Sequence, residues 1–197
     1  MTEREIWDKI KRMTGNEIFT AALMGNMKAE SGLNANNLQN SYENRLGFTD
    51  ETYTKAVDSG EYSGNQFYTD RAGYGLCQWT YWSRKQALLL FARKEGTSIG
   101  DTEMQIDFCI HEMQNSYKSL WEKRATFESL YDAVEAILKH YEKPADQSVK
   151  VIERRTNYAA DFLNQYTEPE YIKIDPKWDK LHDLLMEAIK VLETTNF

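Results

Sequence analysis

Residues that build disulfide frameworks and metal sites are scarce in this chain. Its 197 residues include two cysteines, Cys77 and Cys109, and three histidines, at positions 111, 140 and 182. Two cysteines do not make a disulfide framework, so we expect a free, buried pair. His111-Glu112 begins like the helical zinc motif His-Glu-x-x-His, but position 115 is asparagine. We therefore expect no metal site and no other cofactor.

An excess of positive charge and long apolar runs are also missing. The chain has 24 Lys and Arg against 31 Asp and Glu, a net charge of -7. Proteins that bind a phosphate backbone rely on a basic surface, so nucleic acid is not an expected partner. No apolar run is long enough to span a membrane, and the charged N-terminus lacks the apolar core of a signal peptide. The sequence thus predicts no membrane insertion and delivery by a route other than a classical signal peptide.

One helical pattern in the chain ends in an acid. Asn16 can cap the start of this helix, and Gly32 is well placed to end it. Leu23, Met27 and Glu30 follow at i, i+4 and i+7, so they share one face. The apolar stripe and the negative end of the helix dipole both disfavour the charged form of the carboxyl group. A protonated carboxyl is what glycosidic bond cleavage needs as a general acid. The alternative is an ordinary solvated residue at a helix end.

Helical patterns cover most of the remaining chain, at residues 3–13, 50–58, 81–95, 102–114, 130–141, 147–166 and 178–192. The Asn-rich segment 33–47 predicts a loop, and the alternating, glycine-containing segment 66–80 predicts a short hairpin. We therefore predict an α+β fold that is mostly α-helical, with one small β-hairpin packed beside the helix that carries Glu30. Residues 1–167 would form this domain, and residues 168–197 a linker and a helical appendage.

The predicted hairpin contains groups suited to carbohydrate binding. Gly73 and Gly75 allow a tight turn or the close approach of a ligand to the main chain. Gln78 offers both a donor and an acceptor, and Trp79 offers a flat apolar face. Asp70 adds a second carboxylate at the mouth of a cleft. The alternative is a plain surface hairpin whose glycines serve a turn.

Two short motifs resemble those of a known superfamily. Ala-Glu-Ser-Gly at 29–32 and Gly-Tyr-Gly-Leu-Cys-Gln-Trp at 73–79 look like the paired motifs of goose-type lysozymes and soluble lytic transglycosylases. Together with Tyr-Glu-Lys-Pro at 141–144, they more closely resemble the lysozyme domains of bacteriophage tail and morphogenesis proteins. The resemblance covers roughly residues 14–166 and implies a lysozyme-like globule.

The resemblance also implies a role for each matching residue. Glu30 matches the general acid, and Asp70 is similar to an aspartate that helps to hold the attacking water in goose-type enzymes. Thr80 stands where goose-type enzymes have another aspartate, so the water-holding arrangement would rest more heavily on Asp70. Residues expected to bind the glycan are Ser31, Tyr74, Gly75, Gln78, Trp79 and Tyr141.

The function implied by the resemblance is that of a peptidoglycan hydrolase in phage cell-wall lysis. The enzyme would hydrolyse the β-1,4 bond between N-acetylmuramic acid and N-acetylglucosamine, either within a virion or after delivery to the bacterial wall. Glycan strands would be its substrate, and other phage tail proteins its possible partners. Two alternatives are a lytic transglycosylase, which forms 1,6-anhydro ends, and a wall-binding virion module without turnover.

Overall fold

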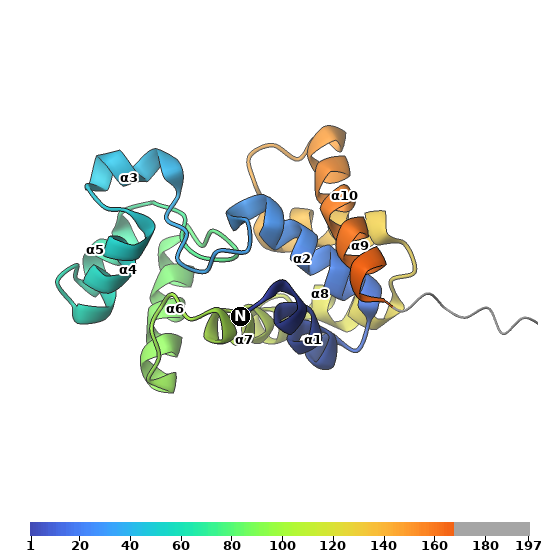
Figure 1. Ribbon diagram of the computed structural model, residues 1–197, viewed down its shortest axis with the longest axis horizontal. Helices are drawn as coiled ribbons and strands as arrows, with labels where there is room; N and C mark the ends of the chain where they lie inside the picture. The colour runs from blue at the N-terminus through green and yellow to red at the C-terminus, as the bar shows by residue number, and fades with distance from the viewer. Residues whose placement is uncertain (168–197) are drawn as a thin grey trace, which may run out of the picture. The chain divides into compact units, whose positions relative to one another are not determined.

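The computed structural model describes residues 1–167 and is almost entirely helical in that range (Figure 1). Met1–Tyr166 form one compact unit. The predicted appendage, residues 168–197, and its helix at 178–192 lie outside the described residues. The mostly helical globule expected from the sequence is confirmed, but residues 1–167 contain no β-strand.

Most of the helices begin at a residue whose side chain caps the first turn. They are α1 (Glu3–Thr14), α2 (Glu17–Ser31), α3 (Asn40–Leu46), α4 (Asp50–Ser59), α5 (Gly64–Thr69), α6 (Trp82–Glu95), α7 (Thr102–Asn115), α8 (Lys118–Lys123), α9 (Leu130–Ile137) and α10 (Val149–Tyr166). A 3-10 turn, η1 (Arg124–Thr126), follows α8, and a π-helical turn, η2 (Leu138–Glu142), continues α9. Helices α3 and α5 were not predicted, and α3 replaces part of the expected loop.

Helix α2 lies at the centre of the fold, in contact with α1, α9 and α10 (Figure 1). It begins as predicted, because the Asn16 side chain accepts a hydrogen bond of 2.7 Å from the backbone N–H of Phe19. Gly32 ends the helix in the left-handed conformation, with φ +65°. All residues from Phe19 to Met27 are buried, so this helix is covered on every side rather than along one stripe.

A glycine in α2 allows α10 to approach closely. A Cβ atom on Gly25 would lie 2.6 Å from the carbonyl oxygen of Arg155 and 2.8 Å from the Cβ atom of Ala159. Neither contact is possible between real side chains, so only glycine permits this crossing. The crossing places Arg155 beside the C-terminal half of α2.

The predicted β-hairpin at residues 66–80 is wrong. The segment contains the end of α5 followed by a tight loop, which is closed by a single antiparallel bridge between Tyr74 and Trp79. Their reciprocal N–H···O bonds measure 3.2 and 2.9 Å. Phe67, Tyr74 and Trp79 are all fully buried. The aromatic residues therefore fill a core around a loop, and their alternation does not mark the two faces of a strand.

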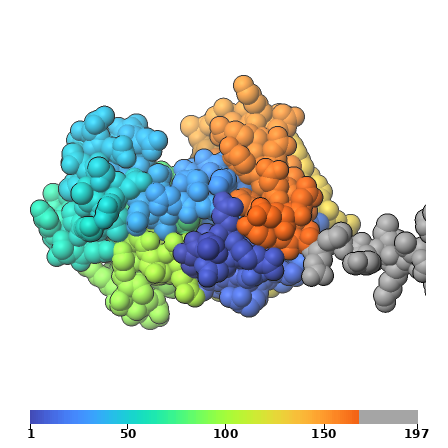
Figure 2. Space-filling view, viewed as in Figure 1, coloured from blue at the N-terminus to red at the C-terminus, as the bar shows by residue number. Residues whose placement is uncertain are grey.

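The surface is hollowed between α3 and α10 (Figure 2). In this view the light blue residues around α3 and the orange residues of α10 form the two sides of the hollow, and residues of α2 form its floor. The C-terminal end of α2, which carries Glu30, points toward this region.

Candidate active site

Glu30 lies in the last turn of α2 and keeps contact with solvent. Its side chain is 19% exposed, and its Oε1 accepts a hydrogen bond of 2.5 Å from Nη2 of Arg155. Nη1 of Arg155 also donates to Oδ1 of Asn26 at 3.0 Å, so the guanidinium group binds α2 at two positions one turn apart. The sequence predicted only an apolar environment for this carboxyl group. The arginine is 125 residues away in the chain, and no local pattern indicates it.

Ser31 connects the acid-bearing helix to the loop at residues 73–79. Its hydroxyl oxygen lies 3.1 Å from the carbonyl oxygens of both Met27 and Leu76, which share its one O–H donor. The backbone N–H of Leu76 is in turn bound by Oε1 of Gln105 at 2.8 Å. A Cβ atom on Gly75 would lie 2.5 Å from Oε1 of Gln105, so the glutamine side chain fills that space. The glycine therefore allows a buried amide to fix the loop beside Glu30.

Gln78 holds the other end of this loop. Its backbone has φ +46°, and its side-chain amide donates to the carbonyl oxygen of Asn37 at 3.1 Å and to the Asn37 side chain at 2.8 Å. A Cβ atom on Gly73 would lie 2.7 Å from Oε1 of Gln78, too close for any residue but glycine. Both glycines singled out in the sequence therefore accommodate a glutamine side chain. The main contacts of Gln78 are within the protein.

The glycan-stacking role of Trp79 stays a prediction, and one that its burial disfavours. Trp79 is 0% exposed, and its ring packs edge-on against Phe108. Tyr74 is likewise fully buried, with its hydroxyl group 2.6 Å from that of Thr54. The aromatic rings that do face solvent follow directly in the chain. Tyr81 and Trp82 are 63% and 53% exposed and lie next to each other, with ring centroids 6.0 Å apart.

A buried polar network surrounds Glu112 of α7. Its carboxylate accepts hydrogen bonds from Nε1 of Trp79 at 2.8 Å and from the Tyr141 hydroxyl group at 2.7 Å. Arg84 binds it through two nitrogens, at 2.9 and 2.8 Å. Tyr141, which was expected to bind the glycan, therefore binds Glu112 through its hydroxyl group. The partners lie 28 to 33 residues from Glu112 along the chain, beyond the reach of local patterns.

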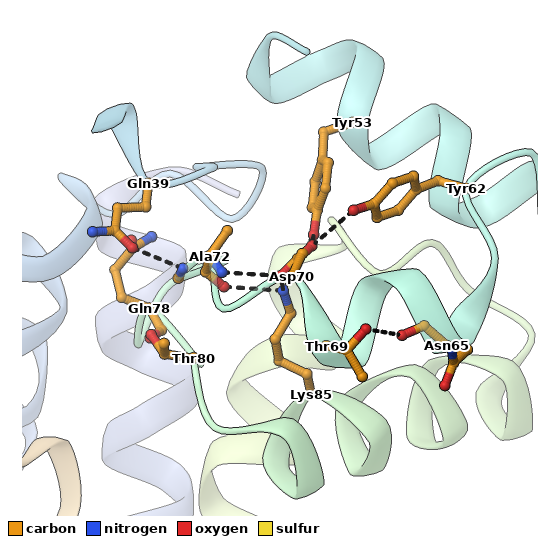
Figure 3. Close-up of polar contacts among 11 residues, drawn as sticks. Gln39, Tyr53, Tyr62, Asn65, Thr69, Asp70, Ala72, Gln78, Thr80 and Lys85 are labelled. Atoms are coloured by element: carbon orange, nitrogen blue, oxygen red, sulfur yellow. Dashed lines mark hydrogen bonds and ion pairs between the residues drawn. The ribbon is translucent and has the colours of Figure 1, made fainter. Parts of the chain in front are cut away.

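Asp70 sits in a buried ion pair (Figure 3). Its Oδ1 accepts from Nζ of Lys85 at 2.5 Å and from the backbone N–H of Ala72 at 2.9 Å, and its Oδ2 accepts from the Tyr53 hydroxyl group at 2.5 Å. Tyr62 adds a contact of 3.5 Å. The side chains of Asp70 and Lys85 are 2% and 0% exposed. The catalytic role of Asp70 stays a prediction, and one that this environment disfavours, because both oxygens are occupied within the protein.

Glu142 is a carboxyl group that feels the charge of Glu30 and that the sequence did not indicate. It ends η2 and is half-buried, and its Oε1 is covered by protein without a hydrogen-bond partner in the structure. Burial first, and then the charge of Glu30, raise the pKa of Glu142 to about 8, although Arg84 and Arg155 act in the opposite direction. The only sequence signal was the Tyr-Glu-Lys-Pro segment, from which the tyrosine alone was selected.

The two cysteines are free and buried, as predicted. The sulfur atoms of Cys77 and Cys109 lie 3.8 Å apart. Burial raises the pKa of the Cys77 thiol well above its usual value, which keeps the group protonated and unreactive. The pair therefore packs the loop against α7.

The chain matches a known family over nearly all of its described residues. The family described as phage tail lysozyme matches residues 1–166, the same range as the compact unit. None of the curated proteins compared with the chain matches it. Within residues 1–167, the helices are too short or too polar to cross a membrane.

Proposed function

The chain belongs to the phage tail lysozyme family, and on this basis we propose that it is a muramidase. The family gives it a peptidoglycan-lytic role and the context of a phage tail. The proposed reaction is hydrolysis of the β-1,4 bond between N-acetylmuramic acid and N-acetylglucosamine. The observation that supports this reaction best is the position of Glu30, which is partly exposed at the end of a helix whose middle is fully buried. It also lies next to Ser31, which is hydrogen-bonded to the loop.

Glu30 would act as the general acid that protonates the leaving oxygen. The buried helix holds its backbone rigidly, and the ion pair with Arg155 fixes Oε1. Guanidinium nitrogens only donate hydrogen bonds, so Oε1 is an acceptor and the donated proton must reside on Oε2. As the glycosidic bond breaks, the sugar develops positive charge, and a water molecule then attacks the anomeric carbon.

The residues predicted to bind the glycan divide into two groups under this proposal. Ser31, Tyr74 and Tyr141 use their hydroxyl groups inside the protein, so they would shape the site rather than bind sugar. Gly75 and the half-buried Gln78 would form the wall of the site beside Glu30. The exposed rings of Tyr81 and Trp82, and not the buried ring of Trp79, would stack on the sugar.

The environment of Asp70 favours a second candidate, a lytic transglycosylase. A hydrolase commonly needs a second carboxylate to activate water or to act as nucleophile. In the transglycosylase reaction, a hydroxyl group of the muramic acid attacks instead, and no water-holding carboxylate is required. Both oxygens of Asp70 are occupied by Lys85, Tyr53 and a backbone N–H, which limits its availability as a base.

Mass spectrometry of the muropeptides released from purified walls would decide between these functions. Reducing ends on the released glycans are the expected result and identify the muramidase. Products with 1,6-anhydro ends would identify a lytic transglycosylase instead. A protein that binds walls but releases no more products than the Glu30→Gln variant would be a binding module.

A further inference from the structure

Two arginine–glutamate pairs in this protein differ in the number of carboxylate oxygens that they use. Arg84 donates to Glu112 through two nitrogens, from Nε to Oε1 at 2.9 Å and from Nη2 to Oε2 at 2.8 Å. This forked arrangement is common, because the planar guanidinium group matches the two oxygens of a carboxylate. Arg155 donates to Glu30 through Nη2 alone, and no group in residues 1–167 donates a hydrogen bond to Oε2 of Glu30. The pair at the acid is therefore only half of a fork.

Asn26 binds the nitrogen that a fork would need. Its Oδ1 accepts a hydrogen bond of 3.0 Å from Nη1 of Arg155, so the two terminal nitrogens of the guanidinium group bind two different side chains of α2. The Nε atom of Arg155 is buried and has no hydrogen-bond partner in the described part of the chain, so it does not bind Glu30 either. The guanidinium group is thus divided between Asn26 and Glu30.

Carbonyl groups of two helices fix the orientation of the Asn26 amide. Its Nδ2 donates to the carbonyl oxygen of Ala22 in α2 at 2.9 Å and to that of Val134 in α9 at 3.4 Å. Carbonyl oxygens only accept hydrogen bonds, so the NH2 end of the amide must face them and Oδ1 must face Arg155. Asn26 is 0% exposed and Arg155 is 3% exposed, so both are shielded from bulk solvent.

A fork on Glu30 would oppose its role as an acid. It would stabilise the carboxylate through both oxygens, so a proton on either oxygen would displace a charge-assisted hydrogen bond. Glu112 illustrates the closed state, because Arg84 occupies both of its oxygens. With a single bond from Arg155, Glu30 has a fixed Oε1 and an Oε2 that can carry the proton.

We propose that Asn26 is a positioning residue that prevents Arg155 from forking Glu30 and so keeps Oε2 of the acid open. This inference rests on the proposed function, in which Oε2 protonates the leaving oxygen. Asn26 is fully buried and acts on the reaction only through Arg155. A neutral acceptor suits this position, because it turns the guanidinium group without neutralising the charge that Glu30 uses.

Asn26→Leu tests this role, because leucine has a similar size and offers no acceptor to Nη1. The freed nitrogen should turn to Oε2 of Glu30. We expect kcat on solubilised glycan strands to fall at least about a hundredfold, the scale of a lost general acid, with KM within about threefold of the parent value. A folded Asn26→Leu with the parent kcat would overturn the inference.

Thr20→Val is the matched control for Asn26→Leu. Thr20 is also a fully buried polar residue of α2, and its hydroxyl group is hydrogen-bonded to Thr14 and to the carbonyl oxygen of Asn16, each at 2.8 Å. The substitution removes these hydrogen bonds at the end of the helix that is far from Glu30. The control should lose stability and keep the parent kcat. An equal loss of kcat in both variants would reduce Asn26 to a structural residue and reject the inference.

A second substitution distinguishes positioning from a purely structural role. Lysine has one terminal nitrogen and cannot span both oxygens of a carboxylate as a guanidinium fork does. Asn26→Leu/Arg155→Lys should therefore open Oε2 again, and we expect its kcat to exceed that of Asn26→Leu at least about tenfold. Arg155→Lys in the parent background should not raise kcat, because no fork exists there to be removed. A double variant no faster than Asn26→Leu would contradict the inference.

Crystal structures test the geometry without any assay of lysis. The parent should show Nη2 of Arg155 on one oxygen of Glu30 and Nη1 on Asn26, and Asn26→Leu should show both nitrogens on Glu30. A fork in the parent would reject the inference even if the variant failed to fold, and a single bond in both proteins would reject it as well. A parent that releases no muropeptides but shows the expected change between the two structures would reject the proposed function alone.

Discussion

Glu30 and Asp70 are the two carboxylates that the sequence selected for catalysis, and the fold treats them differently. Each binds a cation at 2.5 Å, Arg155 for Glu30 and Lys85 for Asp70. The Glu30 side chain is 19% exposed and uses one oxygen, whereas that of Asp70 is 2% exposed and uses both. The comparison teaches that an ion pair can leave one carboxylate oxygen open to solvent or occupy both oxygens inside the core. The number of free oxygens and access to solvent distinguish the two cases.

The largest effect should follow from removing the acid. Glu30→Gln keeps an acceptor for Arg155, so we expect normal folding by circular dichroism and a loss of wall-lytic rate of about a hundredfold to ten-thousandfold. Glu17→Gln, at the first turn of the same helix, is the matched control and should keep the parent rate. Retention of a tenth of the parent rate by a folded Glu30→Gln would remove Glu30 from the mechanism.

Asp70→Asn should damage stability before it damages chemistry. It leaves the fully buried Lys85 without its counter-charge, and we expect a loss of about 3–5 kcal/mol in the free energy of unfolding, measured with urea. The double variant Asp70→Asn/Lys85→Met removes both charges and should recover much of that loss. A hundredfold drop in turnover at unchanged stability would restore Asp70 as the catalytic base and reverse the comparison.

Gly25→Ala tests whether the crossing of α2 and α10 positions the pair of Glu30 and Arg155. The new Cβ would meet Arg155 and Ala159 at 2.6 and 2.8 Å, so α10 must move. We expect a destabilisation of about 1–3 kcal/mol by thermal unfolding, together with a reduced lytic rate for the folded protein. An unchanged rate would mean that the arginine is not needed at its present position.

The smallest effect should come from the exposed aromatic residues. Trp82→Ala should weaken binding of chitooligosaccharides, measured by calorimetry, by about threefold to tenfold, the usual scale for a lost ring contact. Leu90→Ala is the matched control, because Leu90 is a similarly exposed apolar residue on the same helix. Equal affinities for both variants and the parent would show that the Trp82 ring does not stack on the sugar.

Local signals predicted the helices well. The Asn16 cap and the terminal Gly32 each act within four residues, and both occur in the structure. Helix α5 was missed because it is only six residues long and four of them lie in the alternating segment 66–80. That alternation was taken for a strand, although Phe67, Tyr74 and Trp79 are all buried around a loop.

The site was predictable only where one stretch of chain carries it. The position of Glu30 follows from the caps and the spacing of α2. The partners that distinguish Glu30 from Asp70 come from elsewhere in the chain, since Arg155 lies on α10 and Lys85 on α6. Glu142 was missed for the same reason, because its raised pKa depends on burial and on charges from α2, α6 and α10.

The crossing at Gly25 has a consequence for the order in which the protein is made. Arg155 belongs to the last helix of the described residues. The ribosome therefore synthesises Glu30, the loop at residues 73–79 and the residues around Glu112 before the arginine that pairs with Glu30. The half-made chain carries its acid without the arginine that fixes it. Under the proposed function, lytic competence would therefore arise only when α10 docks, late in translation.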